Sequence, residues 1–372
     1  MRILWIPFIP RSSNAWEGSR HFHLLRQLRD HEIHLVAWDR IGAGPSIPQF
    51  HSGVHVHQPR ILPRYWAMWN RDNPRRLDPW LNERILGNQV KRIVRQTNPD
   101  AILVSSSHYA TGHVPLPQGI PVVLDHVDEM PSWVAKKYFN RSDAIATVSP
   151  TLYQNAVGHC PRVEIIENGV DVERYSAESR EDAKARLGLQ DRTVVSLIGL
   201  TCSSRLYFLE AFEKFARRVP NAVLLLVGDC QFTEELKRVD GDIRAIGPVP
   251  YDSVADYFNA TDIGLYPGDN TPYYREAHPL KIVEYTAAGC QVISSPVEAF
   301  LSGWPNVQIS DDNSDSFCEA MLRAFDAPRS IRDVSDMSWK AKAHSLENLI
   351  RETLAENDAK VRTHPTEEPA IA

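Results

Sequence analysis

Three charged side chains, Glu276, Lys281 and Glu284, stand close together in one short segment of the sequence. Pro279 is well suited to a first helical position, and Gly289 to the left-handed residue that follows a helix end. We therefore expect a short helix that begins at Pro279, with Glu276 on the incoming loop and the other two charges as neighbours on the helix surface. Burial of a helix needs none of these charges, so they are candidates for chemistry.

The start of this helix is suited to phosphate, because its unpaired N–H groups and positive dipole end attract anions and Lys281 adds a full positive charge. A carboxylate beside phosphate is repelled unless it faces hydrogen-bond donors, and sugar hydroxyls are such donors. Glu284 is then expected to bind a ribose and Glu276 a second sugar, the order of groups in a nucleotide sugar. The plain alternative is a solvated helix face with a weak ion pair between Lys281 and Glu284.

The elements that must hold these residues alternate between strand and helix through both halves of the 372-residue chain. Strands separated by helices pair in parallel, so the fold class is α/β, with two doubly wound, Rossmann-like domains facing across a cleft. We expect an N-terminal domain over residues 1–175 and a C-terminal domain over 176–338. An amphipathic helix follows over 339–355, and the polar tail 356–372 is expected to be disordered.

Composition describes an ordinary soluble protein with a net charge of −6, which is unevenly spread: +4 over residues 1–175 and −10 over the remainder. Such asymmetry suggests two units with different partners. Five cysteines without a CxxC pair argue against a disulfide framework or a zinc site. We expect no signal peptide, no membrane-spanning segment and a cytoplasmic location.

The segment "PLKIVEYTAAG", with Glu276 before it, resembles the glycosyl transferases group 1, the retaining glycosyltransferases of family 4 with the GT-B fold. Their hallmark is two glutamates separated by seven residues. "SDAIATVSPTLYQNA", "IIENGVDVERY" and "IRAIGPVPYDSVADYFNATDIGLYP" are similar to further family segments. The resemblance implies an acceptor side in 1–175, a nucleotide-sugar donor side in 176–338 and a C-terminal helix that crosses back to the first domain.

The resemblance also implies roles for individual residues. Those that it places at the reacting groups are Glu276, His126 and Asp128. Those that it places at the donor are Glu284, Lys281, Arg205, Gly18, Gly199, Pro279, Leu280, Gly247 and Val249. The chain departs from the family where Ala277, His278 and Pro279 replace a glycine-containing loop, and where "GLTCSSRLYF" offers only Gly199 and Arg205.

The activity that the resemblance implies is transfer of a sugar, hexosyl or related, from a nucleotide sugar to an acceptor hydroxyl with retention. It implies no cofactor and no essential metal. The acceptor stays open between a lipid-linked glycan, a small molecule and a nucleic acid. The alternatives are a non-catalytic subunit that binds nucleotide sugar or glycan, and a sugar-nucleotide epimerase. An NAD dehydrogenase is disfavoured, because no GxGxxG follows the first strand of either half.

Two other stretches could carry function. Residues 60–76 hold five arginines, Tyr65, Trp66 and Trp69, a composition that suits anionic lipid headgroups, nucleic acid or a solvated loop. If this segment contacts lipid, we expect a cytoplasmic protein that attaches peripherally to the inner face of the membrane. His51, His55 and His57 suggest a metal site, which is disfavoured because no carboxylate or cysteine lies close by in the sequence.

Overall fold

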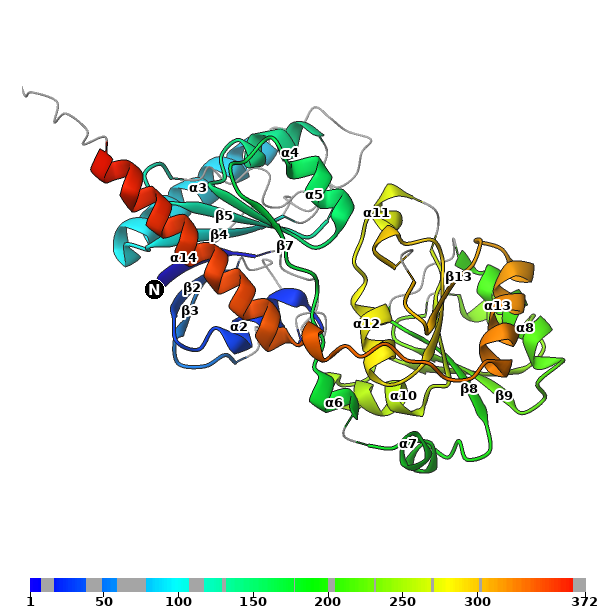
Figure 1. Cartoon of the computed structure of the whole chain (residues 1–372). Helices are drawn as coiled ribbons and strands as arrows, with labels where there is room; N and C mark the ends of the chain where they lie inside the picture. The colour runs from blue at the N-terminus through cyan, green and yellow to red at the C-terminus, as the bar shows by residue number, and fades with distance from the viewer. Residues whose placement is uncertain are drawn as a thin grey trace, which may run out of the picture. The chain divides into compact units, whose positions relative to one another are not determined.

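The computed structural model of the protein describes residues 1–7, 17–37, 49–58, 78–106, 117–128, 132–176, 178–199, 205–230, 232–268, 271–300 and 303–363. The chain divides into two compact units. Unit 1 contains Met1–Ile166 and Lys342–Ala372, and unit 2 contains Glu167–Ala341. The last helix, α14 (Trp339–Thr363), begins in unit 2 and continues in unit 1, as expected for a chain that crosses back (Figure 1).

Unit 1 contains a seven-stranded parallel sheet in the order β3-β2-β1-β4-β5-β6-β7. Its strands are β1 (Arg2–Ile6), β2 (Glu32–Val36), β3 (Val54–His57), β4 (Ala101–Ser106), β5 (Val122–His126), β6 (Ala144–Thr147) and β7 (Val163–Ile165). Its other described helices are α2 (Arg20–Gln27), α3 (Asp78–Thr97), α4 (Ser132–Phe139) and α5 (Pro150–Ala156). The central strands are buried on both faces, because helices cover a parallel sheet on each side.

Unit 2 contains a six-stranded parallel sheet in the order β10-β9-β8-β11-β12-β13. Its strands are β8 (Thr193–Ile198), β9 (Ala222–Val227), β10 (Asp242–Gly247), β11 (Ile263–Tyr266), β12 (Gln291–Ser294) and β13 (Val307–Ile309). Its helices are α6 (Val172–Ser176), α7 (Arg180–Arg186), α8 (Tyr207–Ala216), α9 (Thr233–Leu236), α10 (Val254–Ala260), α11 (Pro272–Arg275), α12 (Leu280–Ala287) and α13 (Ser314–Asp326). Short 3₁₀ turns lie between some of them, among them η3 (Tyr251–Ser253), η4 (Glu298–Phe300) and η5 (Ser335–Met337).

Two apolar layers cover the sheet of unit 2. One contains Phe208 and Phe212 of α8 with Phe317 of α13. The other contains Phe258 of α10 and Tyr285 of α12. Figure 1 shows α8 and α13 together on one side of this sheet and α10 with α12 on the other.

The strand order of unit 2 reverses between β8 and β11. From β8 the chain proceeds outward to β9 and β10, and from β11 it proceeds the other way to β12 and β13. Segments that leave the carboxyl ends of β8 and β11 therefore diverge, and ligand sites of doubly wound sheets lie at such a point of reversal. The expected fold class of two Rossmann-like parallel-sheet units is confirmed.

Two boundaries differ from those expected. The units change at Glu167 rather than after residue 175, because Val170 and Tyr175 already pack into the core of unit 2. Helix α14 continues past residue 355 to Thr363. On its outer turns, Glu352 and Glu356 both pair with Arg162 of unit 1.

Candidate functional site in unit 2

Helix α12 is fixed on the sheet of unit 2 by one buried tyrosine. The Tyr285 hydroxyl accepts from the backbone N–H of Ile198 and donates to the carbonyl of Ser196, both at 3.0 Å. Its ring lies over Gly264 of β11, where an added Cβ would come within 2.5 Å of ring carbons. Sequence reasoning missed Tyr285, although it stands directly after Glu284. The tyrosine bonds the helix to β8, and the glycine provides the space for its ring.

Glu284, on α12, is 6% exposed and accepts two hydrogen bonds. The Tyr175 hydroxyl donates to Oε1 and the Lys281 ammonium donates to Oε2, each at 2.9 Å. The ion pair between Lys281 and Glu284 that was the plain alternative is thus present. It is not a solvated surface pair, because the Glu284 side chain is 8% exposed and that of Lys281 is 31% exposed. A carboxylate has about four lone-pair sites, so further donors can still bind.

The first turn of α12 is open to an anion. Pro279 is the N-cap residue rather than the first helical residue, Leu280 follows it as the first, and no side chain caps the helix. The N–H groups of the first turn therefore lack a capping side chain, and the positive end of the helix dipole adds to them. Lys281 lies in this turn, and its Cε would be 3.6 Å from a Cβ placed at Gly199.

Gly199 and Gly228 bring the ends of β8 and β9 unusually close. A Cβ on Gly228, which has a φ of +130°, would lie 2.2 Å from the carbonyl oxygen of Gly199. The N–H of Gly228 donates to the carbonyl of Gly247 at 2.9 Å, and Gly247 ends β10 with a φ of +79°. Val249 follows and packs partly buried against the core. Gly199, Lys281 and Gly247 thus belong to one connected edge of the sheet.

The loop before α12 holds Glu276, which is half-buried. The Asn168 amide donates to the carbonyl of His278 in this loop at 2.6 Å. Arg205 lies beside the preceding helix, with its guanidinium carbon 3.9 Å from the centre of the Tyr274 ring. The structure therefore places Glu276 and Arg205 on or beside the α11–α12 segment.

The segment "ENGVDVERY" has a structural explanation in these contacts. Asn168 fixes the loop before α12, and Tyr175 donates to Glu284. Gly169 allows the chain to pass Trp339, since an added Cβ would come within 2.9 Å of its ring. Val170 pairs with Ser338 as an isolated parallel bridge. The sequence singled out this segment as a domain junction, and its polar residues also support the site.

Residues of unit 1

The carboxyl end of β5 in unit 1 carries His126, and Asp128 follows it. His126 is 2% exposed, and burial lowers its pKa to about 4, which keeps the imidazole neutral at pH 7. Asp128 is partly buried, and the loss of water around it, with the nearby charge of Asp125, raises its pKa to about 6. Two groups at the same end of β5 whose pKa values move in opposite directions are suited to proton handling.

A buried ion pair supports this end of the sheet. Asp125 is fully buried, and the Arg20 guanidinium lies 3.0 Å from its carboxylate. His21 Nε2 lies 4.0 Å from the other oxygen, and burial lowers the pKa of His21 to about 4. The sequence analysis missed Arg20, His21 and Asp125, although the polar run around Gly18 and the aspartate before His126 were visible.

Gly18 lies in the turn before α2. Ser19 caps that helix, accepting a hydrogen bond from the N–H of Phe22 through its side chain. Arg20, the first residue of α2, carries the buried pair with Asp125. The structure thus joins two segments that sequence analysis treated separately: the glycine-containing loop and the end of β5.

Other candidate sites

Three histidines gather where β2 pairs with β3. His34 Nδ1 lies 3.0 Å from His57 Nε2, and its Nε2 lies 3.1 Å from Glu32. The His34 ring stacks on that of His55, with 5.2 Å between centroids. Glu32 of β2 thus supplies a carboxylate beside this histidine cluster, although it is distant from the histidines of β3 in the sequence. Within the described ranges, no group of three or more His, Cys, Asp or Glu side chains could hold a metal ion.

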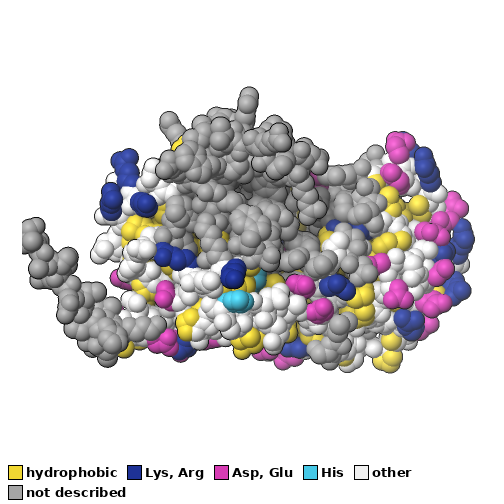
Figure 2. Space-filling view, turned by 90° about the horizontal axis from the view of Figure 1, so that it is seen from above, with side chains coloured by type: hydrophobic (Ala, Val, Ile, Leu, Met, Phe, Trp, Pro, Cys, Tyr) yellow, Lys and Arg dark blue, Asp and Glu magenta, His cyan; other side chains and the backbone are white. Residues whose placement is uncertain are grey.

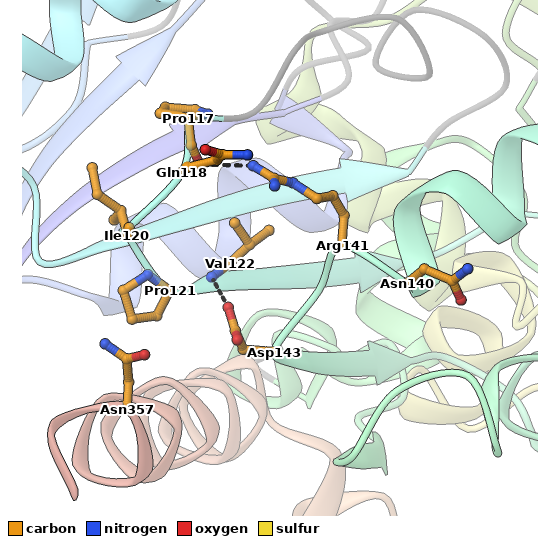
Figure 3. Close-up of a pocket in the computed structure, with 10 residues that line it drawn as sticks. Pro117, Gln118, Ile120, Pro121, Val122, Asn140, Arg141, Asp143 and Asn357 are labelled. Carbon is orange, nitrogen blue, oxygen red and sulfur yellow. Dashed lines mark hydrogen bonds between the residues drawn. The ribbon is translucent and has the colours of Figure 1, made fainter. Parts of the chain in front are cut away.

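A polar pocket of about 250 Å³ lies at the amino end of the unit 1 sheet, opposite the end that carries His126. Figure 3 shows Arg141 pointing toward the Pro117–Gln118 backbone and Asp143 bonded to the start of β5. Arg141 donates to the carbonyl of Pro117 at 2.9 Å, and Asp143 accepts from the N–H of Val122 at 2.8 Å. These two charges of opposite sign hold the loop before β5.

The basic and aromatic segment 60–76 lies outside the described residues. Its expected contact with lipid or nucleic acid therefore remains a prediction from composition. Among the helices that the structure does describe, none combines the length and the apolarity that crossing a bilayer requires.

Similarity to known proteins

Residues 198–327 match the family model described as glycosyl transferases group 1. This part of the chain is therefore similar to that family. The match runs from the end of β8 to the end of α13, so it contains Gly199, Lys281 and Glu284, and it confirms the resemblance for this part of the chain.

One curated relative is the GDP-mannose-dependent monoacylated alpha-(1-6)-phosphatidylinositol monomannoside mannosyltransferase of Corynebacterium glutamicum. It is 25% identical over 232 residues, which are 54% of this chain and 58% of the relative. The alignments span about half the length of the curated relatives that the chain matches.

Solved structures match over almost the whole length of this chain. Sucrose-phosphate synthase from Thermosynechococcus elongatus has a TM-score of 0.66 at 14% identity, over 98% of this chain and 99% of that one. Anabaena Alr3699/HepE in complex with UDP has a TM-score of 0.61 at 14% identity, over 99% and 100%. These likenesses show that both units share the fold of glycosyltransferases.

Proposed function

We propose that the protein is a retaining glycosyltransferase that transfers a sugar from a nucleotide sugar to an acceptor hydroxyl. The observation that carries this proposal is the arrangement on α12. An uncapped first turn and Lys281 offer positive charge, while the buried carboxylate of Glu284 lies one turn further on. A cationic cradle beside an oriented carboxylate matches a diphosphate that is followed by a ribose.

Each donor-binding residue has a role in this proposal. The first-turn N–H groups and Lys281 bind the diphosphate, and Arg205 adds charge. Glu284 accepts hydrogen bonds from the ribose hydroxyls. The Gly199–Gly228 contact removes side chains where the backbone must approach the phosphates closely. Gly247 and Val249, at the end of β10, are the proposed contacts for the base.

In the chemical step, the bond between the sugar and the diphosphate breaks and a bond to the acceptor oxygen forms on the same face. The acceptor proton passes to a phosphate oxygen of the leaving nucleoside diphosphate, so no side chain is required as a nucleophile. Negative charge grows on the diphosphate, and Lys281 with the α12 N–H groups stabilises that charge where it develops.

The remaining residues are assigned to the sugar and the acceptor. Glu276 accepts from hydroxyls of the transferred sugar. In unit 1, neutral His126 and ionised Asp128 accept hydrogen bonds from hydroxyl groups. Gly18 allows its loop to approach the donor closely. We propose neither a cofactor nor a metal. A lipid-linked glycan is the first acceptor class to test, because the C. glutamicum relative is named for a phosphatidylinositol mannoside acceptor.

A thermal-shift screen of UDP, GDP, ADP and CDP tests the proposal. One nucleotide should raise the unfolding temperature, since a ligand at a hundredfold excess over its dissociation constant adds about 2.7 kcal/mol of stability. The matched variant Lys281→Met should lose most of that shift. No shift with any nucleotide would contradict the donor site.

Turnover separates the alternatives. Slow release of nucleotide from its sugar without acceptor is expected of a transferase. A non-catalytic subunit would bind and release the donor unchanged, and an epimerase would convert the donor sugar while keeping the diphosphate bond.

A further inference from the structure

A chain of side-chain hydrogen bonds crosses three neighbouring strands of the unit 1 sheet. Arg2 of β1 donates through Nε to Glu32 of β2 at 3.1 Å, and Glu32 also lies 3.1 Å from Nε2 of His34. His34 Nδ1 lies 3.0 Å from Nε2 of His57, the last residue of β3. The imidazoles of His34 and His57 thus connect the side chains of β2 and β3.

The protons in this chain of bonds can be assigned at neutral pH. Glu32 is ionised, because its bond to Arg2 lowers its pKa, and an ionised carboxylate only accepts hydrogen bonds. His34 must then donate from Nε2 to Glu32 and, as a neutral ring, accept at Nδ1. His57 therefore donates from Nε2 to His34. Burial lowers the pKa of both rings, more than the neighbouring Glu32 raises that of His34, so the neutral forms are favoured.

Acid removes this arrangement in two steps. A first proton is tolerated, because a charged His34 can donate from Nδ1 to a His57 that has moved its own proton to Nδ1. A second proton leaves two N–H groups facing each other across 3.0 Å, and two donors cannot pair. His55, whose ring stacks on that of His34 at 5.2 Å, adds a third positive charge when it is protonated. Of the other charged groups that act on His34, Glu32 favours the charged ring and Arg2 disfavours it.

Strand β3 has little else to hold it in place. It stands at the end of the strand order, beside β2. None of its four residues is buried, and Val56 is 40% exposed, whereas four of the five residues of β2 are buried. An edge strand with few apolar contacts opens locally at a low cost in free energy. Two facing positive charges should therefore separate this strand rather than unfold the sheet.

We propose that the His34–His57 pair is an acid-sensitive switch. It holds the carboxyl end of β3 on β2 at neutral pH and releases that end when both rings are protonated. Because the sheet is parallel, this end of β3 lies at the same edge as His126. Release in acid therefore loosens part of the edge to which the proposed function assigns the acceptor. That consequence rests on the proposed function, whereas the switch itself does not.

Histidine accounts for most titration between pH 7.5 and 5.5. Figure 2 shows one face of the molecule on which the coloured charged groups are mostly Lys, Arg, Asp and Glu, with few histidines among them. The ordinary pKa values of those four residue types lie outside this window. Asp128, whose pKa is raised to about 6, is an exception. The experiment therefore needs a reference amide remote from β3.

Amide hydrogen exchange of the full chain at both pH values, expressed as protection relative to an unstructured peptide at the same pH, tests the proposal. The Ala37 N–H donates to the carbonyl of His57 at 2.8 Å and reports on the switch. The Ile102 N–H donates to the carbonyl of Pro121 at 2.9 Å and is the reference. From pH 7.5 to 5.5, protection of Ala37 should fall about tenfold relative to Ile102. The open strand takes up protons that the paired rings resist, and a coupling of about one pK unit is a factor of ten.

Two matched variants separate the switch from other effects of acid. His57→Gln keeps an N–H donor for His34 Nδ1 but takes up no proton, so protection of its Ala37 N–H should stay almost unchanged between the two pH values. His344→Gln removes an exposed histidine of α14 and should lose protection as the natural protein does. A loss in His57→Gln as large as that of the natural protein would overturn the proposal.

NMR of the imidazole nitrogens in the natural protein is a second test, which needs no variant. At pH 7.5, His34 and His57 should both carry their proton on Nε2, and on acidification they should titrate in two coupled steps. Independent titration of the two rings at the ordinary value of 6.5 would contradict the switch. These measurements are made without nucleotide, so failure of the nucleotide screen would leave them unaffected.

Discussion

Replacing Glu284 with glutamine tests the proposed contact with the ribose. The side chain keeps its shape and one acceptor oxygen, which can still receive the hydrogen bond from Tyr175. Its new NH2 group would face the Lys281 ammonium, now 2.9 Å from Oε2, and two donors cannot pair. The ribose loses a charge-assisted partner worth about 1.5–3 kcal/mol, so nucleotide affinity should fall about 10- to 100-fold.

The same change also costs stability, and the two effects must be separated. Loss of the partly buried ion pair should lower the free energy of unfolding by about 1–2 kcal/mol, since Lys281 is 31% exposed and water can replace its partner. Tyr175→Phe is the matched control. It removes one hydrogen bond to Glu284, keeps the ring and the carboxylate, and should cost about 1 kcal/mol while leaving nucleotide affinity almost unchanged.

The assay is calorimetric titration with the nucleotide that the screen identifies and with its 2′,3′-dideoxy analogue, beside urea unfolding. The natural protein should prefer the ribonucleotide, and Glu284→Gln should lose that preference. A variant that still discriminates as strongly as the natural protein would refute the contact, whatever its stability.

Two further predictions concern a glycine and a carboxyl group. Gly228→Ala should lower the free energy of unfolding by about 2–5 kcal/mol, because its Cβ would meet the Gly199 carbonyl at 2.2 Å and its φ is +130°; an unfolding curve like that of the natural protein would contradict this. Activity should fall as pH drops through about 6, where Asp128 becomes protonated, and Asp128→Asn should abolish this limb of the profile. In stability the sign is opposite: because folding raises the pKa of Asp128 from 3.8, acidification from pH 6 to 4 favours the folded state through this group. His126, whose pKa falls from 6.5 to about 4, disfavours the folded state over the same window, so urea unfolding of Asp128→Asn should show a steeper loss of stability with acid.

Much of the fold was predictable, because buried parallel strands and amphipathic helices have local sequence signals. The helix after Pro279 and the strand at Gln291 are examples, and the N-cap position of Pro279 differs from prediction by one residue. Helix ends are the least determined feature of such patterns. The continuation of α14 past residue 355 was missed, and there Glu356 pairs with Arg162, a contact between distant parts of the sequence.

The candidate site was only partly predictable for a related reason. Glu276, Lys281 and Glu284 stand in one segment, so spacing on a helix could relate them. Tyr175 meets Glu284 across 109 residues of sequence, and Arg20 meets Asp125 across 105. No local pattern encodes such pairs.

The contacts of Glu284 bear on how the donor site responds to its ligand. Without a nucleotide, Lys281 and Glu284 neutralise one another at 2.9 Å. A diphosphate competes for the lysine, and a ribose offers hydroxyls to the carboxylate, so the two ends of one ligand replace both halves of the pair. A ligand with only one of these groups would leave the other partner with an unpaired, partly buried charge, which is costly. Free diphosphate and free nucleoside should each therefore bind much more weakly than the nucleoside diphosphate, by more than their separate contacts would suggest.

In Glu284→Gln the glutamine no longer neutralises Lys281, so free diphosphate should gain affinity while the nucleoside diphosphate loses it. Calorimetric titration with both ligands measures these opposite changes, and losses for both would show that the pair does not compete with the ligand.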